Sequence, residues 1–199
     1  DAARARVEAG PRFQVDRAAL ALTPLPPCLS ERARRDLERL PLPPRPHAFD
    51  PQLVPFTAAC LAGLPWVKDV DAVRLDGRGR LAFSLVAREP VARIGAQGDQ
   101  ALTRDGAVVP LAYAAAPEAL PALEGVAVSG AARDRALGAA NAVLRELADL
   151  RAHVVALDLS NLDGARDPLR SEVVLVLAQG PRVDWGRPPE QDRDEPASP

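Results

Sequence analysis

The sequence from Leu64 to Ile94, LPWVKDVDAVRLDGRGRLAFSLVAREPVARI, predicts a β-hairpin with one buried face. In the segment 81–86, apolar residues that share one side of an extended strand occupy every second position: Leu81, Phe83 and Leu85. The segment 70–75 alternates less regularly and supplies the partner strand. Between them, Asp76–Gly79 contains two glycines, which adopt positive φ angles without steric cost and suit a tight reversal. We therefore expect two paired strands joined by a short turn.

A strand and a helix are expected upstream of this hairpin. The alternation in Phe13–Asp16 predicts a first strand. Ser30 is a suitable N-cap for a helix over 31–40, because its hydroxyl accepts a hydrogen bond from a backbone N–H of the first turn. The helix is expected to bury a stripe made of Ala33, Leu37 and Leu40. Glu31 and Arg35 are expected to form an ion pair one turn apart.

A second helix is expected before the hairpin. The segment Pro41–Pro46 is interpreted as a stiff connector between the two helices, the alternative being a polyproline ligand for an SH3-like partner. Asp50 is placed to cap a helix that has Pro51 at its first position and ends near Gly63. Its expected apolar face consists of Leu53, Phe56, Cys60 and Leu61. The order strand, helix, helix, strand, strand predicts a small sheet covered on one face by two helices.

After Pro90 the pattern predicts a second, β-rich half. Residues 101–103 and 107–111 flank Asp105-Gly106 and predict another hairpin. The segment 131–150 predicts a long helix with one apolar stripe, made of Ala136, Ala140, Val143, Leu144, Leu147 and Leu150. Three further strands are expected at Val154–Leu159, Glu172–Leu177 and Arg182–Trp185, the last two joined by a turn at Gln179-Gly180-Pro181.

Two short motifs on either side of the first hairpin carry a family resemblance. Leu64-Pro65-Trp66-Val67 precedes the two strands, and Arg88-Glu89-Pro90-Val91-Ala92 follows them. In this order and spacing they resemble the extracytoplasmic part of the FtsQ/DivIB bacterial cell-division proteins, where they mark the end of a POTRA domain and the passage into a β-domain. Leu120–Gly125 resembles the Leu-Pro-x-Leu-x-Gly element of the same family. The resemblance extends from roughly Phe13 to Arg187.

The resemblance implies a role without catalysis. It implies a scaffold that links components of the divisome at the septum, with FtsB/FtsL-like membrane proteins as partners. It also implies a location on the periplasmic side of the cell inner membrane, with a single-pass anchor expected upstream of Asp1. POTRA surfaces and open sheet edges would bind partner segments as added strands.

The C-terminal end departs from the family pattern. The strand at Val183–Arg187 is usually followed in the family by another helix and a closing strand, where strand addition is expected. Here it runs into Pro188-Pro189 and an acidic tail, which predicts a truncated or divergent member. The last strand then becomes the sheet edge, so we take Arg182, Val183 and Trp185 as candidate partner-binding residues. For Trp185, packing against the helix at 131–150 is an equally good interpretation.

Composition excludes several classes of function. The chain has 25 basic and 27 acidic residues and a net charge of -2, which gives no electrostatic basis for binding nucleic acid. Its longest uncharged run, 51–67, is short for a membrane span and contains three prolines and a glycine. The first ten residues lack the apolar stretch of a signal peptide. The absence of methionine predicts a processed product or a portion of a longer protein.

Neither a metal site, a cofactor site nor a small-molecule substrate site is predicted. Cys28 and Cys60 are the only cysteines and have no nearby Cys or His cluster. They are interpreted either as small buried apolar residues or as one disulfide in an oxidising compartment. Asp158 and Asp163 are the pair that a small periplasmic hydrolase would use, but alternation places Asp158 on a solvent face and Asp163-Gly164 signals a turn.

The expected fold class is therefore α+β, with two modules. Residues 1–11 are expected to be a linker remnant, 12–94 a POTRA-like domain of order β-α-α-β-β, 95–187 a mostly antiparallel β-domain with one long helix, and 188–199 a disordered acidic tail. Trp66 is expected to fill the junction between the second helix and the sheet. The alternative functions are a POTRA-type interaction module of outer-membrane assembly or secretion, and the hydrolase.

Overall fold

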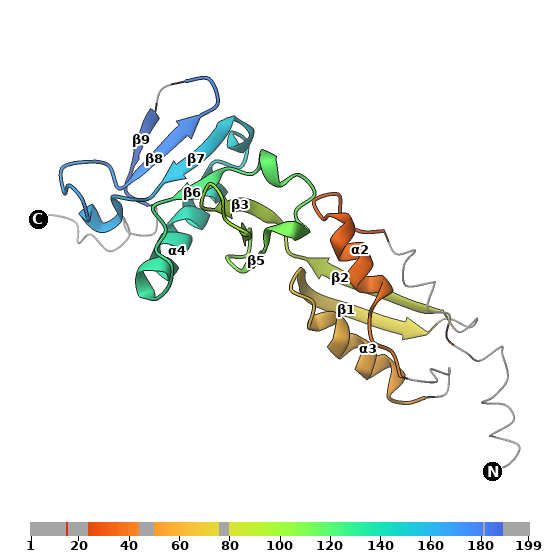
Figure 1. Ribbon diagram of the computed structural model, residues 1–199. Coiled ribbons are helices and arrows are strands. Elements are labelled where there is room, and N and C mark those ends of the chain that lie inside the picture. The colour runs from red at the N-terminus through yellow and green to blue at the C-terminus, as the bar shows by residue number, and fades with distance from the viewer. Residues whose placement is uncertain (1–14, 16–23, 44–49, 76–79, 181, 189–199) are drawn as a thin grey trace, which may run out of the picture. The chain divides into compact units, whose positions relative to one another are not determined.

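The computed structural model describes residue 15 and residues 24–43, 50–75, 80–180 and 182–188. The chain divides into two compact units, Asp1–Arg88 and Glu89–Pro199. Figure 1 shows the elements of each unit. The described residues are a mixture of α and β structure, with three α-helices and sheets of two and seven strands, so the expected α+β class is confirmed.

The first unit contains helices α2 (Glu31–Glu38) and α3 (Leu53–Ala62) and strands β1 (Val67–Leu75) and β2 (Leu81–Ala87). Helix α2 begins as predicted, because the Ser30 hydroxyl accepts a hydrogen bond from the Arg32 N–H at 3.3 Å. Its predicted stripe of Ala33, Leu37 and Leu40 is buried. The predicted Glu31–Arg35 pair is replaced by one between Glu31 and Arg34 at 3.0 Å, one of the two spacings that place side chains on the same helix face.

Helix α3 differs from the prediction in its start and in its buried face. It begins at Leu53 rather than Pro51, and the Asp50 carboxylate accepts a hydrogen bond from the Gln52 N–H in the preceding turn. Phe56 is 42% exposed, and the buried position one residue later belongs to Thr57. A threonine is tolerated there because its hydroxyl donates to the Leu53 carbonyl at 2.7 Å, so no polar group is left unpaired.

Strands β1 and β2 form the predicted antiparallel hairpin, with Leu75 paired to Leu81 and Val67 to Ala87. The odd-numbered residues of β2 are the less exposed ones, as its alternation predicts. The expected turn at 76–79, the expected strand at Phe13–Asp16 except Val15, and the N-terminal linker lie outside the described residues. The full β-α-α-β-β order of a POTRA domain therefore stays a prediction.

The second unit is built on one seven-stranded sheet. Its strands are β3 (Pro90–Ile94), β4 (Gln100–Thr103), β5 (Val108–Pro110), β6 (Ala122–Glu124), β7 (Val154–Asp158), β8 (Val173–Leu177) and β9 (Arg182–Gly186). Their spatial order is β5-β4-β3-β6-β7-β8-β9. The pairs that β6 makes with β3 and β7 are parallel and the others are antiparallel, so the sheet is mixed. The predicted hairpin at 101–111 and the three predicted C-terminal strands are present.

Strand β3 shows where the second unit starts. The sequence places the boundary after residue 94, whereas β3 pairs with β4 and β6 inside the seven-stranded sheet. The Arg88-Glu89-Pro90 motif therefore lies at the junction of the two units. Among the described residues of the second unit there are also short 3₁₀ turns, at Leu111–Tyr113, Pro117–Ala119, Arg151–His153 and Leu162–Gly164.

Helix α4 (Ala131–Glu146) packs against the sheet and forms the core of the second unit. Five residues of its predicted stripe are buried, namely Ala136, Ala140, Val143, Leu144 and Leu147. The sixth prediction is wrong, because Leu150 is 57% exposed. The helix ends at Glu146, so Leu150 lies in the following turn and no longer shares the helical period. From the sheet, Leu123, Leu157 and Leu175 face the same core.

Candidate functional site

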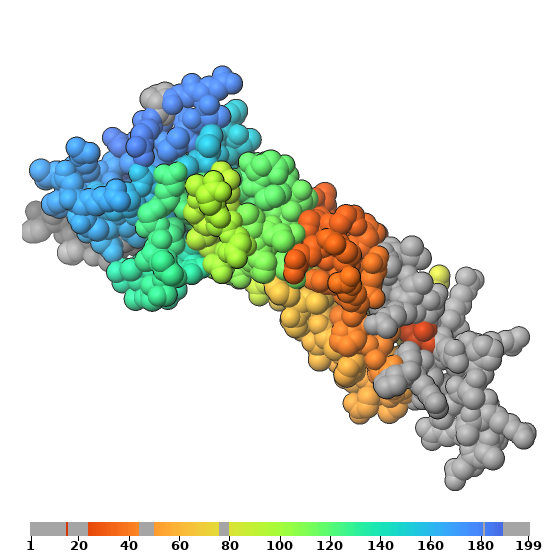
Figure 2. Space-filling view, in the orientation of Figure 1, coloured from red at the N-terminus to blue at the C-terminus, as the bar shows by residue number. Residues whose placement is uncertain are grey.

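Strand β9 is the last strand at one edge of the seven-stranded sheet. It pairs with β8 through Arg182–Val176, Val183–Leu175 and Asp184–Val174. On its other side, no strand pairs with it within the part of the chain that the structure describes. Alternate backbone N–H and C=O groups of an edge strand point away from the sheet and can pair with an added strand. Figure 2 shows the blue residues of β8 and β9 at the surface of the second unit.

The three candidate binding residues on β9 differ in exposure. Arg182 and Val183 are exposed, and Val183 is 38% exposed. Trp185 is partly buried and packs against the hydrophobic core that α4 forms with the sheet. The interpretation of Trp185 as a packing residue therefore fits its position better than that of a free anchor. Sequence analysis overlooked Asp184, although its position between Val183 and Trp185 in an alternating strand predicts that it faces the opposite side.

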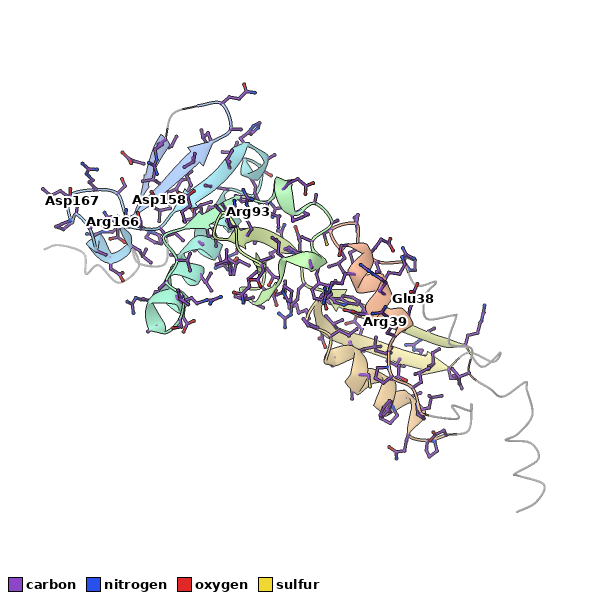
Figure 3. The ribbon with its side chains drawn as sticks, in the orientation of Figure 1. Glu38, Arg39, Arg93, Asp158, Arg166 and Asp167 are labelled. Atoms are coloured by element: carbon purple, nitrogen blue, oxygen red, sulfur yellow. The ribbon has the colours of Figure 1, made fainter. Side chains whose placement is uncertain are left out.

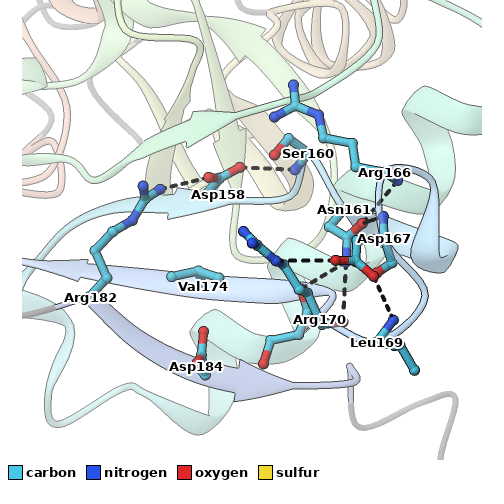
Figure 4. A pocket seen from close by; sticks show the side chains of 11 residues that line it. Asp158, Ser160, Asn161, Arg166, Asp167, Leu169, Arg170, Val174, Arg182 and Asp184 are labelled. Atoms are coloured by element: carbon cyan, nitrogen blue, oxygen red, sulfur yellow. Dashed lines mark hydrogen bonds and ion pairs between the residues drawn. The ribbon is translucent and has the colours of Figure 1, made fainter.

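A groove lies on the face of β7, β8 and β9 that points away from α4. Its volume is about 780 Å³, and it is lined by Asp158, Ser160, Asn161, Val174, Arg182, Asp184 and residues of the loop 166–171. Figure 4 shows Asp158, Val174 and Asp184 across the three strands, with the loop forming one wall. The pairing explains this row, because Val174 is the register partner of both Asp158 and Asp184.

Asn161 holds the wall of the groove in place. Its Oδ1 accepts hydrogen bonds from the backbone N–H groups of Arg166 and Asp167 at 2.9 and 2.8 Å. Its Nδ2 lies 2.9, 3.1 and 3.2 Å from the carbonyl oxygens of Asp167, Arg170 and Ser171. One side chain thus contacts five backbone groups of a loop that has a backbone hydrogen bond of its own, from the Arg170 N–H to the Asp167 carbonyl at 3.1 Å. Sequence analysis also missed this residue, and no local motif predicts pairing with groups up to ten positions away.

The carboxylates that line the groove differ in the hydrogen bonds and ion pairs that they form. The Asp158 carboxylate accepts a hydrogen bond from the Ser160 N–H at 3.0 Å and pairs with the Arg182 guanidinium at 2.7 Å. Partial burial acts to raise the pKa of Asp158, but the hydrogen bonds from Ser160 and the charges of Arg182 and Arg166 outweigh burial and hold that pKa below its ordinary value. Asp167 pairs with Arg170 at 3.2 Å. Figure 3 marks Asp158, Arg166 and Asp167 in the second unit.

The two acidic residues that a hydrolase would use are not brought together. Asp158 lines the groove, whereas Asp163 pairs with Arg135 on α4 at 3.1 Å and is not a lining residue. Asp163 has a positive φ of 58°, as the predicted turn at Asp163-Gly164 requires. Asp158, which alternation places on a solvent face, points into the groove on the side away from the core. This separation does not give the paired carboxylates of general acid–base hydrolysis.

The Leu-Pro-Trp-Val motif lies at the turn from α3 into β1. The Val67 N–H donates to the Leu64 carbonyl at 3.0 Å, which closes the turn around Pro65. Trp66 is fully buried, as predicted, and its carbonyl accepts a hydrogen bond from the Arg88 N–H at 2.8 Å. The motif therefore has a structural role in the described part of the first unit.

Glu89 of the second motif anchors the start of the second unit. Its carboxylate accepts two hydrogen bonds from Arg104, at 2.8 and 2.9 Å, and lies 3.4 Å from Arg151. The hydrogen bond from Arg104 lowers the pKa of Glu89, against the opposing effect of partial burial, and the charges of both arginines lower it further. Pro90 begins β3, a position at which a missing N–H is tolerated.

The described residues offer little for a redox, metal or membrane-spanning site. Cys28 and Cys60 are not joined in a disulfide, and both are half-buried rather than buried as the apolar interpretation expects. Among the described residues, no group of three or more His, Cys, Asp or Glu side chains is arranged to hold a metal ion. Within the same ranges, no helix has both the length and the apolar character that crossing a membrane requires.

The chain was also compared with known proteins. No protein-family model matches the sequence. A search of curated proteins likewise found no significant match.

Proposed function

We propose that this chain is a non-catalytic protein-interaction module, the periplasmic part of an FtsQ-like scaffold of the divisome. The observation that carries the proposal is the edge position of β9 in the seven-stranded sheet. An unpaired edge is a template for a further strand, and recognition by strand addition uses backbone pairing for affinity and flanking side chains for specificity. Partners would be FtsB/FtsL-like membrane proteins that reach the same compartment at the septum.

The two edges of the sheet are not equivalent, which supports binding at β9. Strand β5 at the opposite edge has only three residues, Val108–Pro110, and ends in a proline that has no N–H to donate. Strand β9 has five residues, Arg182–Gly186, and contains no proline. Short strands and prolines are the usual means of preventing edge pairing. A short strand and a terminal proline thus protect the β5 edge, whereas the described residues of β9 have neither, although β9 carries two charged residues and a bulge opposite Val173 and Val174.

Placement of the two motifs supports the family part of the proposal. The Leu-Pro-Trp-Val motif connects a helix to the first strand of a hairpin, and Arg88-Glu89-Pro90 lies at the junction of the two units. The resemblance implies these positions for the end of a POTRA domain and the start of the β-domain. The described order of the first unit, two helices followed by two antiparallel strands, agrees with the POTRA order as far as it extends.

A matched pair of valines tests the proposal. Val183 on β9 and Val108 on β5 are each 38% exposed, so Val183→Asp and Val108→Asp introduce the same change at opposite edges. The 199-residue chain and both variants are each mixed with the extracytoplasmic segments of the FtsB/FtsL-like proteins of the same organism, and binding is measured by calorimetry. We expect Val183→Asp to weaken binding at least tenfold and Val108→Asp to leave it unchanged.

Two results would overturn the proposal. No binding by the unmodified chain would remove the divisome role, and loss of binding in Val108→Asp alone would move the interaction to the β5 edge. Thermal unfolding of both variants serves as the control for folding, because each substitution adds a charge at a half-exposed site.

A further inference from the structure

The two faces of β9 have different chemistry. Val183 pairs with Leu175 of the core and Trp185 packs against that core, so both lie on the α4 side of the sheet. Because side chains alternate along a strand, Arg182 and Asp184 lie on the opposite side, where both line the groove. A strand added to β9 would have the same alternation. Its residues would lie beside Val183 and Trp185 on one face and beside Arg182 and Asp184 on the other.

On the groove side, some of the charged side chains form ion pairs and one carboxylate does not. Arg182 is already engaged by Asp158 at 2.7 Å, and Asp167 is engaged by Arg170. The Asp184 carboxylate has no ion pair with any residue in the part of the chain that the structure describes. Like Arg182, it is exposed and lies on the edge strand itself, so it is the charge without an ion-pair partner that lies next to an added strand.

The remaining arginine of the groove lies away from this edge. Figure 4 shows Arg166 beside Ser160, on the far side of the groove from Asp184. Its charge contributes to lowering the pKa of Asp158, together with that of Arg182. An added strand would therefore contact one unmatched carboxylate at the edge before it reached any unmatched guanidinium.

We infer that the segment bound at β9 is an extended strand with alternating apolar and basic residues, whose basic side chain enters the groove beside Asp184. The inference rests on the proposed function and specifies the partner of the same edge. Apolar residues of this strand would extend the surface of Val183 and Trp185. The groove, at about 780 Å³, has room for an arginine or lysine side chain. Opposite charges directly across a sheet stabilise the pair, and like charges destabilise it.

Three synthetic peptides of equal length test this pairing. Each alternates valine with a second residue, which is arginine, threonine or glutamate, and each is titrated into the ¹⁵N-labelled 199-residue chain. Binding is followed by the backbone amide shifts of β9. We expect the arginine peptide to bind about two- to fivefold more tightly than the threonine peptide, and the glutamate peptide to bind most weakly.

Two variants distinguish an effect of the Asp184 charge on peptide binding from an effect of the chain's net charge. Asp184→Asn is expected to abolish the difference between the arginine and threonine peptides. Asp149→Asn makes the same change at an exposed residue beyond the end of α4 and is expected to preserve that difference.

The outcomes distinguish this inference from the proposal on which it rests. Equal binding of all three peptides at β9, or a preference for the arginine peptide that persists in Asp184→Asn, would refute the inference of a basic partner but not strand addition itself. Tighter binding of the glutamate peptide would overturn it in favour of an acidic partner. If none of the peptides shifts the β9 amides, both the basic partner and strand addition at this edge fail.

Discussion

Replacement of Asn161 by alanine should loosen the wall of the groove while leaving the core of the second unit folded. Asn161 Oδ1 accepts two hydrogen bonds, from the N–H groups of Arg166 and Asp167. Its Nδ2 carries two hydrogens, so it satisfies two of the three nearby carbonyls at a time. With two accepted and two donated, four hydrogen bonds are lost.

The size of the effect follows from these contacts. Each hydrogen bond contributes about 0.5–1.5 kcal/mol net. Loss of the four should therefore destabilise the ordered conformation of the loop by about 2–6 kcal/mol. The free energy of global unfolding is expected to fall by an amount in the lower part of this range, because the freed polar groups lie in a surface loop and can bond to water. The core residues Leu157 and Val173 on the adjoining strands are fully buried and are untouched by the change.

Amide hydrogen exchange measures the effect residue by residue. In Asn161→Ala, the Arg166 and Asp167 amides should exchange at least tenfold faster, while the amides of β7 keep their protection. Asn161→Asp keeps an acceptor for the Arg166 and Asp167 N–H groups but sets a second acceptor oxygen against the three carbonyls that Nδ2 contacts. The protection of both loop amides should therefore lie between that of the unmodified chain and that of Asn161→Ala. Unchanged exchange of Arg166 and Asp167 in Asn161→Ala would refute the assignment of Asn161 as the residue that holds the loop.

Three further substitutions probe the same region. Gly125→Ala should destabilise the second unit by more than about 1 kcal/mol, since φ is +75° there and an added Cβ would clash with the backbone nitrogen of Ser160. An unchanged melting temperature would contradict this. Leu157→Ala should cost about 2–5 kcal/mol in a denaturant titration, because the side chain is fully buried in the core. Asp158→Asn should cost up to about 1 kcal/mol at neutral pH, through its ion pair with the largely exposed Arg182. Because the pKa of Asp158 is lowered in the folded state, the difference in unfolding free energy between the two proteins should be present above the unfolded-state pKa of about 3.9. It should disappear as the pH falls through the folded-state pKa, and a difference that stays constant down to about pH 2 would contradict this.

Local periodicity predicted the helices, the strands and their buried faces better than it predicted which strands lie next to one another. The alternation of β2, the stripe of α2 and most of the stripe of α4 have the burial that their spacing predicts, because one buried face imposes its period on the sequence. Where the prediction failed, a local competing effect was responsible. Thr57 takes the buried position expected for Phe56 by bonding its hydroxyl within the helix.

The site was less predictable because it depends on which strands become neighbours. The parallel strand β6 has three residues, Ala122–Glu124, and lies between β3 and β7, so that it joins the β3–β4 hairpin to the C-terminal strands. Three residues carry too little periodicity to be assigned from sequence alone. Asp158 and Arg182 are 24 positions apart and meet only because β8 lies between their strands. Arg182, Val183 and Trp185 could be named from the sequence because they lie on one continuous strand.

The most direct test of strand addition at β9 is amide hydrogen exchange of the 199-residue chain with and without the extracytoplasmic segment of its FtsB-like partner. Amides that face the open edge exchange quickly in the free protein, because they pair with no other strand. We predict that alternate amides within Arg182–Gly186 gain protection in the complex and that those of Val108 and Val109 do not. Protection gained at Val108 and Val109 or on helices α2 and α3, with none at β9, would contradict strand addition at β9.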